Sequence, residues 1–206
     1  ALAMELDCLD LAPAGVAAPH RAPPPTGEVN PASIATALSA MLPEGAIVVD
    51  EGVTTGREFF PATAGLPPHD WMNNRGGSIG YGMPVAVGAA IACPERKVIA
   101  LIGDGSAMYT MQSLWTMARE NLDVTVLIFA NGSYNILRGE LTNVGVQNPG
   151  PRAVDMLSLD RPDLNWVAMA KGMGVEGQRA NTAEDLVKAL DAGLHSEGPY
   201  LIEVAL

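Results

Sequence analysis

"LIGDGSAMYTMQSLW", residues 101–115, joins an apolar run to a glycine-rich turn and then to a pattern with helical spacing. The apolar run predicts a buried strand, and the pattern after the turn predicts a helix. The free N–H groups of the first helical turn would point back at the glycines, a geometry that binds phosphate. Asp104 lies in this turn, although a bare carboxylate repels phosphate. A divalent cation between the two groups removes the conflict, so the turn predicts a metal-bound phosphate.

The same alternation of strands and helices continues along the chain. Buried strands are expected within residues 45–52, 97–105, 123–132 and 199–206. Helices are expected within residues 30–43, 53–64, 107–122, 133–141, 163–174 and 182–196, and another should follow the glycine-rich turn near the start of 74–94. Asn30 and Thr182 are the expected N-caps of two of them. The alternation predicts an α/β fold, doubly wound, with a mostly parallel sheet and helices on both faces.

The composition excludes several classes of protein. The chain has 206 residues and a formal net charge of −11, which argues against nucleic acid as its main ligand. We find no run of about 20 apolar residues, so no membrane span is expected. The two cysteines, Cys8 and Cys93, lack metal-ligand spacing, which favours a reducing, cytoplasmic location. Only 17% of the residues are charged, which is consistent with surface buried against partners, as in a homo-oligomer.

The N-terminal residues differ in composition from the rest of the chain. Residues 11–28, "LAPAGVAAPHRAPPPTGE", are rich in proline and alanine and read as an extended linker. We therefore expect residues 1–29 to be a linker from a preceding domain and residues 30–206 to be one domain.

Polar residues end three of the expected strands, at 50–52, 103–105 and 131–133. Because ligands of open parallel sheets bind beyond the carboxyl ends of the strands, these groups should meet at one edge. Asp104 offers a carboxylate oxygen and Asn131 an amide oxygen, and Mg²⁺ prefers such ligands together with phosphate oxygens. The segment between them is long enough for one helix and one strand, so the two residues should end neighbouring strands.

Gly-Asp-Gly at 103–105, followed after about 25 residues by Asn131, resembles the signature of thiamine diphosphate enzymes. The stretches 74–105 and 103–141 are similar to the acetolactate synthase and benzoylformate decarboxylase branch, and the resemblance covers roughly residues 30–206. It implies a domain that binds the cofactor's diphosphate together with Mg²⁺.

The resemblance also implies roles for individual residues. The metal ligands would be the side chains of Asp104 and Asn131 and the main-chain carbonyl of Ser133. Thr54 and the N–H groups of Gly105, Ser106 and Tyr134 would bind the diphosphate, next to Gly103. The Gly77 carbonyl would accept a hydrogen bond from the cofactor's 4′-amino group, and Ile79 would hold the two rings in a V. This V brings the 4′-nitrogen to thiazolium C2, so Gly77 and Ile79 are the expected catalytic residues.

Some residues have structural alternatives. Asp104 and Asn131-Gly132 can be ordinary turn residues, and Ile79 can be plain core. Glu51 reads equally well as a cap and as an acid at the edge of the site.

The implied activity is decarboxylation or carboligation of a 2-oxo acid, as in acetolactate synthase. A benzoylformate decarboxylase-like enzyme that forms an aldehyde is the alternative, and a non-catalytic partner module with the same fold is a second one. Leu137 is expected in the substrate wall, together with Glu140, which stands where the benzoylformate enzyme carries an aromatic residue. The glutamate that activates the cofactor belongs to another domain of the family, the pyrimidine-binding domain, so the isolated chain is expected to be inactive.

Overall fold

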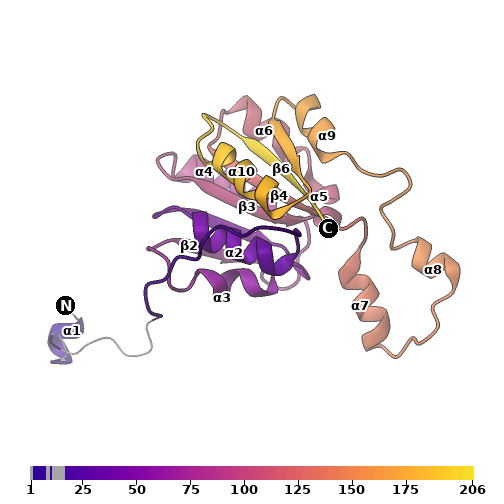
Figure 1. The fold of residues 1–206 in the computed structure, drawn as a ribbon, viewed down its shortest axis with the longest axis horizontal. Helices are drawn as coiled ribbons and strands as arrows, with labels where there is room; N and C mark the ends of the chain where they lie inside the picture. Colours follow the sequence, from indigo (N-terminus) through magenta and orange to yellow (C-terminus); the bar gives the residue numbers. More distant parts are fainter. Residues whose placement is uncertain (1, 8–9, 11–16) are drawn as a thin grey trace.

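The computed structural model in Figure 1 describes residues 2–7, 10 and 17–206 of the chain. Its centre is a six-stranded sheet in which all neighbouring strands are parallel. The strands are β1 (Ile47–Glu51), β2 (Asp70–Asn73), β3 (Val98–Gly103), β4 (Val124–Ala130), β5 (Glu176–Ala180) and β6 (Tyr200–Ala205). Their order across the sheet is β2-β1-β3-β4-β6-β5. The predicted parallel α/β architecture is therefore confirmed.

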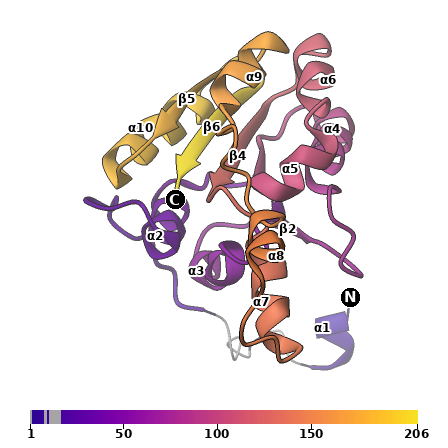
Figure 2. The same ribbon diagram turned by 90° about the vertical axis from the view of Figure 1, so that its right-hand side faces the viewer.

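Helices cover both faces of this sheet (Figure 2). One layer contains α2 (Pro31–Met41), α3 (Phe59–Thr63) and α10 (Ala183–Leu194). The opposite layer contains α4 (Gly82–Ala92), α5 (Asp104–Thr110), α6 (Ser113–Arg119) and α9 (Trp166–Gly172). The remaining helices are α1 (Leu2–Glu5), the 3₁₀ turn η1 (Gly56–Glu58), α7 (Asn135–Asn143) and α8 (Pro151–Asp155). The fold is doubly wound, as expected.

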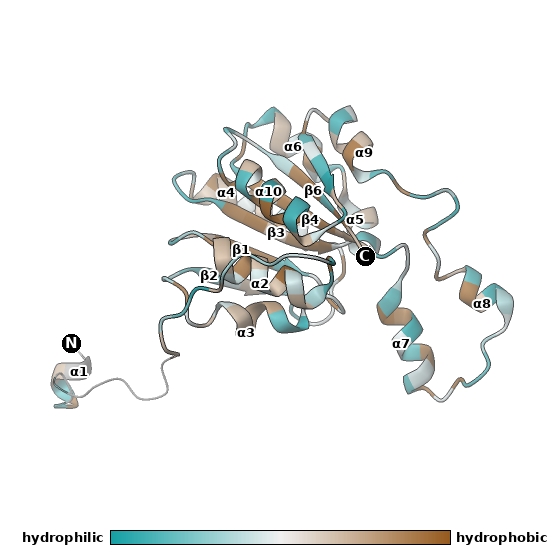
Figure 3. Cartoon of the chain, viewed as in Figure 1, coloured by the Kyte–Doolittle hydropathy of each residue, from teal (hydrophilic) through white to brown (hydrophobic). Residues whose placement is uncertain are grey.

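The two faces of the sheet support separate hydrophobic cores. Leu101 and Leu127 belong to the core under α2, α3 and α10, whereas Ala100 and Val126 belong to the opposite core. All four residues are fully buried. Consecutive side chains of a strand point to opposite faces, so a strand covered on both faces is an unbroken apolar run. Figure 3 shows these runs as brown strands in the middle of the molecule.

The sequence analysis missed the two edge strands, β2 and β5. Their sequences, "DWMN" and "EGQRA", contain mostly polar residues, and only one residue in the two strands is buried. Edge strands are paired on one side only and commonly carry polar or charged side chains. Hydrophobic runs therefore identified the four central strands and gave no signal at either edge.

Two helical segments also differ from the prediction. The single helix expected over residues 107–122 is divided into α5 and α6 by a tight turn, in which Leu114 N–H donates to the Met111 carbonyl at 3.0 Å. The short helix α8 was not predicted. The helix expected at 133–141 is present as α7, and α7 and α8 extend away from the body of the domain (Figure 1).

The segment before α2 lies partly on the domain. His20 N–H donates to the Gly65 carbonyl at 2.9 Å, and Arg21 donates to the carbonyls of Ala40 and Leu42. Val29 is buried. Part of the expected linker, residues 1, 8–9 and 11–16, lies outside the described residues, and the domain boundary at residue 30 remains a prediction.

No helix in the described part of the chain has the length and apolar composition needed to cross a membrane.

The predicted start of α2 is confirmed, and it generates a test of local stability. Asn30 Oδ1 accepts from Ser33 N–H at 3.0 Å, and Ser33 Oγ accepts from Asn30 N–H at 2.9 Å. Asn30→Ala should lower the free energy of unfolding by about 1 kcal/mol, because a helix N–H loses its acceptor. Asn30→Ser retains an acceptor oxygen and should lose much less. Urea unfolding of the three proteins checks this, and equal stability of both variants would contradict it.

Candidate diphosphate and metal site

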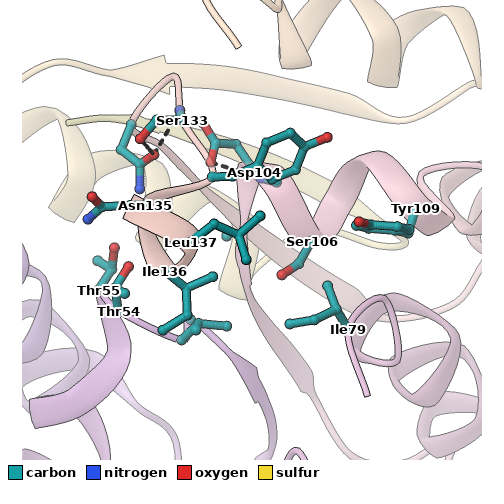
Figure 4. Close-up of a pocket in the computed structure, with 16 residues that line it drawn as sticks. Thr54, Thr55, Ile79, Asp104, Ser106, Tyr109, Ser133, Asn135, Ile136 and Leu137 are labelled. Carbon is teal, nitrogen blue, oxygen red and sulfur yellow. Dashed lines mark hydrogen bonds between the residues drawn. The ribbon is translucent and has the colours of Figure 1, made fainter. Parts of the chain in front are cut away.

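The turns that follow β1, β3 and β4 line one cavity at the carboxyl edge of the sheet (Figure 4). Ile79 and Tyr109 complete its wall. Gly103 at the end of β3 is paired with Phe129 of β4, so the turns after these two strands lie side by side. The predicted meeting of the three strand ends is therefore confirmed.

Asp104, the first residue of α5, connects the start of this helix to the turn after β4. It is only 2% exposed. Its Oδ1 accepts from Gly105 N–H at 2.8 Å, and its Oδ2 accepts from Gly132 N–H at 2.7 Å. Burial raises the pKa of Asp104, and the hydrogen bonds from Gly132 and Gly105 partly oppose this effect. A cation beside this carboxylate would favour its ionised form.

Asn131 and Ser133 line the cavity beside Asp104, on either side of Gly132. Asn131 Oδ1 accepts from the Ser133 N–H at 3.0 Å and from the Ser133 hydroxyl at 3.1 Å. Gly132 between them has a φ of +64°, a conformation that glycine adopts without steric cost. The turn is therefore bent sharply, and its residues Asn131 and Ser133 line the same cavity as Asp104.

This donor set fits a hard cation. The described residues contain no group of three or more His, Cys, Asp and Glu side chains that could hold a metal. A metal here would therefore depend on the Asn131 amide and the Ser133 carbonyl in addition to Asp104. Each carboxylate oxygen accepts one hydrogen bond and keeps a further lone pair. The Ser133 hydroxyl can rotate away from Asn131 Oδ1, which frees a lone pair there.

The predicted phosphate-binding groups lie around the same cavity, with two differences in their main-chain contacts. The cavity is lined by Thr54, Gly103, Gly105, Ser106 and Tyr134. The Gly105 N–H donates to Asp104, and the Tyr134 N–H donates to the Leu157 carbonyl at 2.9 Å. Both N–H groups already have partners, so a phosphate would have to displace those partners to accept from them.

Gly105 has a steric reason to be glycine. A Cβ at this position would lie 2.7 Å from Cδ1 of Tyr134. The aromatic ring thus packs directly on the turn that follows β3. Tyr134 therefore contacts Gly105 of the predicted site through its aromatic ring, whereas its N–H donates to Leu157.

The turn after β1 contributes Thr54 and Thr55 to the cavity. Val53, which precedes them, has a φ of +46°, and this is an uncommon conformation for a β-branched residue. Such strained residues occur frequently at functional sites. No feature of the sequence pattern predicted this conformation of Val53.

The glycine-rich loop that precedes α4 contains Gly77 and Ile79. Gly76, Gly77 and Gly80 all have positive φ, which explains the concentration of glycine here. Ile79 is 42% exposed and belongs to neither hydrophobic core, which excludes the interpretation of Ile79 as plain core. It lines the first cavity and, with Gly77, a second cavity beside it.

Glu51, for which the sequence left two interpretations open, holds this loop. It is 2% exposed, and its carboxylate accepts from Gly80 N–H at 2.5 Å and from Gly82 N–H at 2.7 Å. Burial raises the pKa of Glu51, and the main-chain hydrogen bonds oppose the rise. Its visible role is therefore that of a cap on the loop. In the sequence, the only indication of this role was the position of Glu51 at the end of an apolar strand.

The two candidates for the substrate wall are separated in the structure. Leu137 on α7 lines both cavities and is 47% exposed. Glu140 lies one turn further along α7, next to an apolar groove between α7 and α8. It lines neither of the two cavities, and its Oε1 accepts from Asn143. Glu140 is therefore not brought to the site, whereas Ile136, which was not predicted, is.

Comparison with known proteins identifies relatives of the whole domain. The chain is 51% identical over 194 residues to the "Putative acetolactate synthase large subunit IlvX" of Mycobacterium tuberculosis (strain H37Rv), covering 94% of this chain and 38% of that protein. It is 36% identical over 178 residues to a benzoylformate decarboxylase of Pseudomonas aeruginosa, covering 86% of this chain and 32% of that protein. The chain thus spans about a third of the length of these relatives.

A solved structure gives the same result. The Rhodococcus jostii thiamine diphosphate-dependent 4-hydroxybenzoylformate decarboxylase matches with a TM-score of 0.74 and 33% identity, covering 90% of this chain and 34% of that one. The family model "Thiamine pyrophosphate enzyme, C-terminal TPP binding domain" matches residues 57–204. That range includes most of the predicted site and more than half of the chain. The chain therefore belongs to the thiamine pyrophosphate enzyme family, in which it corresponds to the C-terminal TPP-binding domain.

Proposed function

We propose that this chain binds the diphosphate of thiamine diphosphate through Mg²⁺ in an acetolactate synthase-like enzyme that decarboxylates a 2-oxo acid and joins the product to a second carbonyl compound. Asp104, Asn131 and the Ser133 carbonyl hold the metal, and Thr54, Gly105 and Ser106 lie on the phosphate side. When bound, the cofactor supplies an electron sink for the loss of CO₂. Ile79 would hold the cofactor's two rings in a V, and the Gly77 carbonyl would accept a hydrogen bond from its amino group.

One observation carries this proposal. Asp104 and Asn131 are 27 positions apart in the sequence, yet they line one cavity together with Ile79, which comes from a third segment. If Asp104 and Asn131 were ordinary turn residues, their sharing a cavity with an exposed isoleucine would be a coincidence. The intact set of oxygen donors also favours an enzyme over a non-catalytic module, in which loss of a ligand would be tolerated.

A benzoylformate decarboxylase-like activity is the second candidate. It is favoured by the apolar side chains of Ile79, Ile136 and Leu137 in the cavity wall, which would suit an aromatic substrate. Assay of the holoenzyme with a panel of 2-oxo acids separates the two candidates. Acyloin products from small aliphatic acids support the first, and aldehyde formed from benzoylformate supports the second.

The metal site generates the first functional test. Asp104→Asn keeps the shape of the side chain and removes its charge, so Mg²⁺-dependent binding of thiamine diphosphate to the holoenzyme should weaken by at least 100-fold, a loss of about 2.7 kcal/mol. Isothermal titration with and without Mg²⁺ measures this. Glu95→Gln is the matched control, because Glu95 is exposed and precedes β3 at the other edge of the sheet. Unchanged affinity in Asp104→Asn would refute the metal site.

The division of the active site generates a second test. The activating glutamate is expected from a pyrimidine-binding domain, carried by the same polypeptide or by a separate subunit. The purified chain alone should therefore release no measurable CO₂ from any 2-oxo acid at saturating cofactor and Mg²⁺. Turnover by this chain alone would overturn the proposed division.

The exposed position of Ile79 generates a third test. Ile79→Ala should lower kcat of the holoenzyme by about ten-fold or more, equivalent to roughly 1.4 kcal/mol, because the support of the V conformation is lost. Cofactor affinity should change much less, since the metal anchor lies elsewhere in the cavity. Because the side chain is 42% exposed, the melting temperature should also change little. A large drop in melting temperature with normal kcat would remove Ile79 from the mechanism.

A further inference from the structure

Glu51 joins two parts of the site that lie far apart in the sequence. It is the last residue of β1, and the turn 52–55 that follows it lines the first cavity. Its Oε1 and Oε2 accept from the N–H groups of Gly80 and Gly82, which bracket the end of the loop that carries Ile79. A single carboxylate thus connects the turn on the phosphate side to the loop that carries Ile79.

The loop fits closely around this carboxylate. A Cβ at Gly82 would lie 2.7 Å from Oε2 of Glu51 and 2.4 Å from Cδ1 of Ile102. A Cβ at Gly80 would lie 2.9 Å from Cβ of Tyr109, and Gly80 has a φ of +92°. Glycine at both positions therefore permits the main chain to approach Glu51 on one side and α5 on the other.

A second contact holds the loop from α5. The Thr110 hydroxyl donates to the Gly80 carbonyl at 2.9 Å. Gly80 is thus bonded through its N–H to the end of β1 and through its carbonyl to the end of α5, the helix that starts at Asp104. Ile79, the neighbour of Gly80, is exposed and belongs to neither hydrophobic core.

We propose that Glu51 is a positioning residue of this site. Its carboxylate, assisted by the Thr110 hydroxyl, fixes the position of Ile79 and Gly77 relative to the residues proposed to bind the metal and the diphosphate. Hydrogen bonds to an ionised acceptor are stronger than neutral ones, and a buried carboxylate with two N–H donors is held in one geometry. Loss of Glu51 would leave two buried N–H groups without an acceptor, and the loop would rearrange to satisfy them.

The geometry disfavours Glu51 as a proton donor to a ligand. Both of its oxygen atoms are occupied by main-chain N–H groups, and the side chain is 2% exposed. It lines the second cavity and not the first, in which Asp104 and Asn131 lie. Glu51 therefore acts through the loop rather than on a bound molecule.

The chain provides a matched control for this proposal. Glu203 on β6 is also 2% exposed, and its Oε2 accepts from the N–H groups of Trp166 and Val167 at the start of α9. Glu203 also pairs with Arg179 at 3.0 Å. Glu203→Gln thus disturbs a buried carboxylate that caps main-chain donors at the start of α9, beside a third cavity that Asp104 and Asn131 also line. Its hydrogen bonds go to α9 and not to residues 76–82, so any purely structural effect of Glu51→Gln should be matched by it.

The inference rests on the proposed function. One measurement therefore needs no cofactor, so that a failure of the role of Glu51 can be distinguished from a failure of the proposed function. In the holoenzyme without cofactor, Glu51→Gln should raise amide hydrogen exchange in residues 76–82 by at least ten-fold, and Glu203→Gln should leave it unchanged. Thr110→Val, which removes the second contact from a less buried position, should raise exchange in the same residues by a smaller factor.

The second measurement uses the cofactor but not turnover. With thiamine diphosphate and Mg²⁺ bound, exchange of the cofactor's C2 proton should slow by about ten-fold in Glu51→Gln, while cofactor affinity changes by less than about three-fold. Glu203→Gln should retain the wild-type exchange rate. Binding and C2-proton exchange by the wild-type protein test the proposed function, and the difference between the variants tests Glu51.

Two results would overturn the proposal. Unchanged amide exchange in residues 76–82 of Glu51→Gln would show that the carboxylate does not hold the loop, whatever the cofactor does. Equal slowing of C2-proton exchange in Glu51→Gln and Glu203→Gln would show that both act only through general stability.

Discussion

The site depends on one buried carboxylate that binds two turns at the same time. Asp104 accepts hydrogen bonds from Gly105 in its own turn and from Gly132 in the turn after the neighbouring strand. These bonds connect the ends of β3 and β4, and each oxygen of the carboxylate, which lines the shared cavity, keeps a further lone pair. A buried carboxylate without such donors would be costly, so the glycine N–H groups make a buried charge tolerable in this position.

The parallel sheet gives this carboxylate its surroundings. In a parallel sheet all strands end at the same edge, so the turns after β1, β3 and β4 converge without a dedicated structure to bring them together. Each turn then adds a different chemical group: threonine hydroxyls, a carboxylate, and amide and main-chain oxygens. The glycine-rich loop before α4 closes the site from the side, where Glu51 fixes its main chain and leaves Ile79 exposed in the cavity.

The parts of the fold that could be predicted are those with a periodic or local signal. The apolar runs of β1, β3, β4 and β6 identified the buried strands, and Asn30 and Thr182 identified the helix starts. The polar edge strands β2 and β5 carry no such runs, because an exposed edge does not need them. The break between α5 and α6 and the position of α7 and α8 outside the body of the domain have no periodic signal in the local sequence.

By itself, the sequence determined the candidate oxygen donors of the site, Asp104 and Asn131, and the strands that bring them to one edge of the sheet. The tertiary structure decided how each side chain is used. In the folded chain Glu140 lies beside the groove between α7 and α8 instead of in the two cavities of the site. The Tyr134 N–H donates to the Leu157 carbonyl, and Glu51 caps the glycine-rich loop. The physical reason is that residue type limits the bonds a group can form, whereas its actual partner depends on contacts between segments that are distant in the chain.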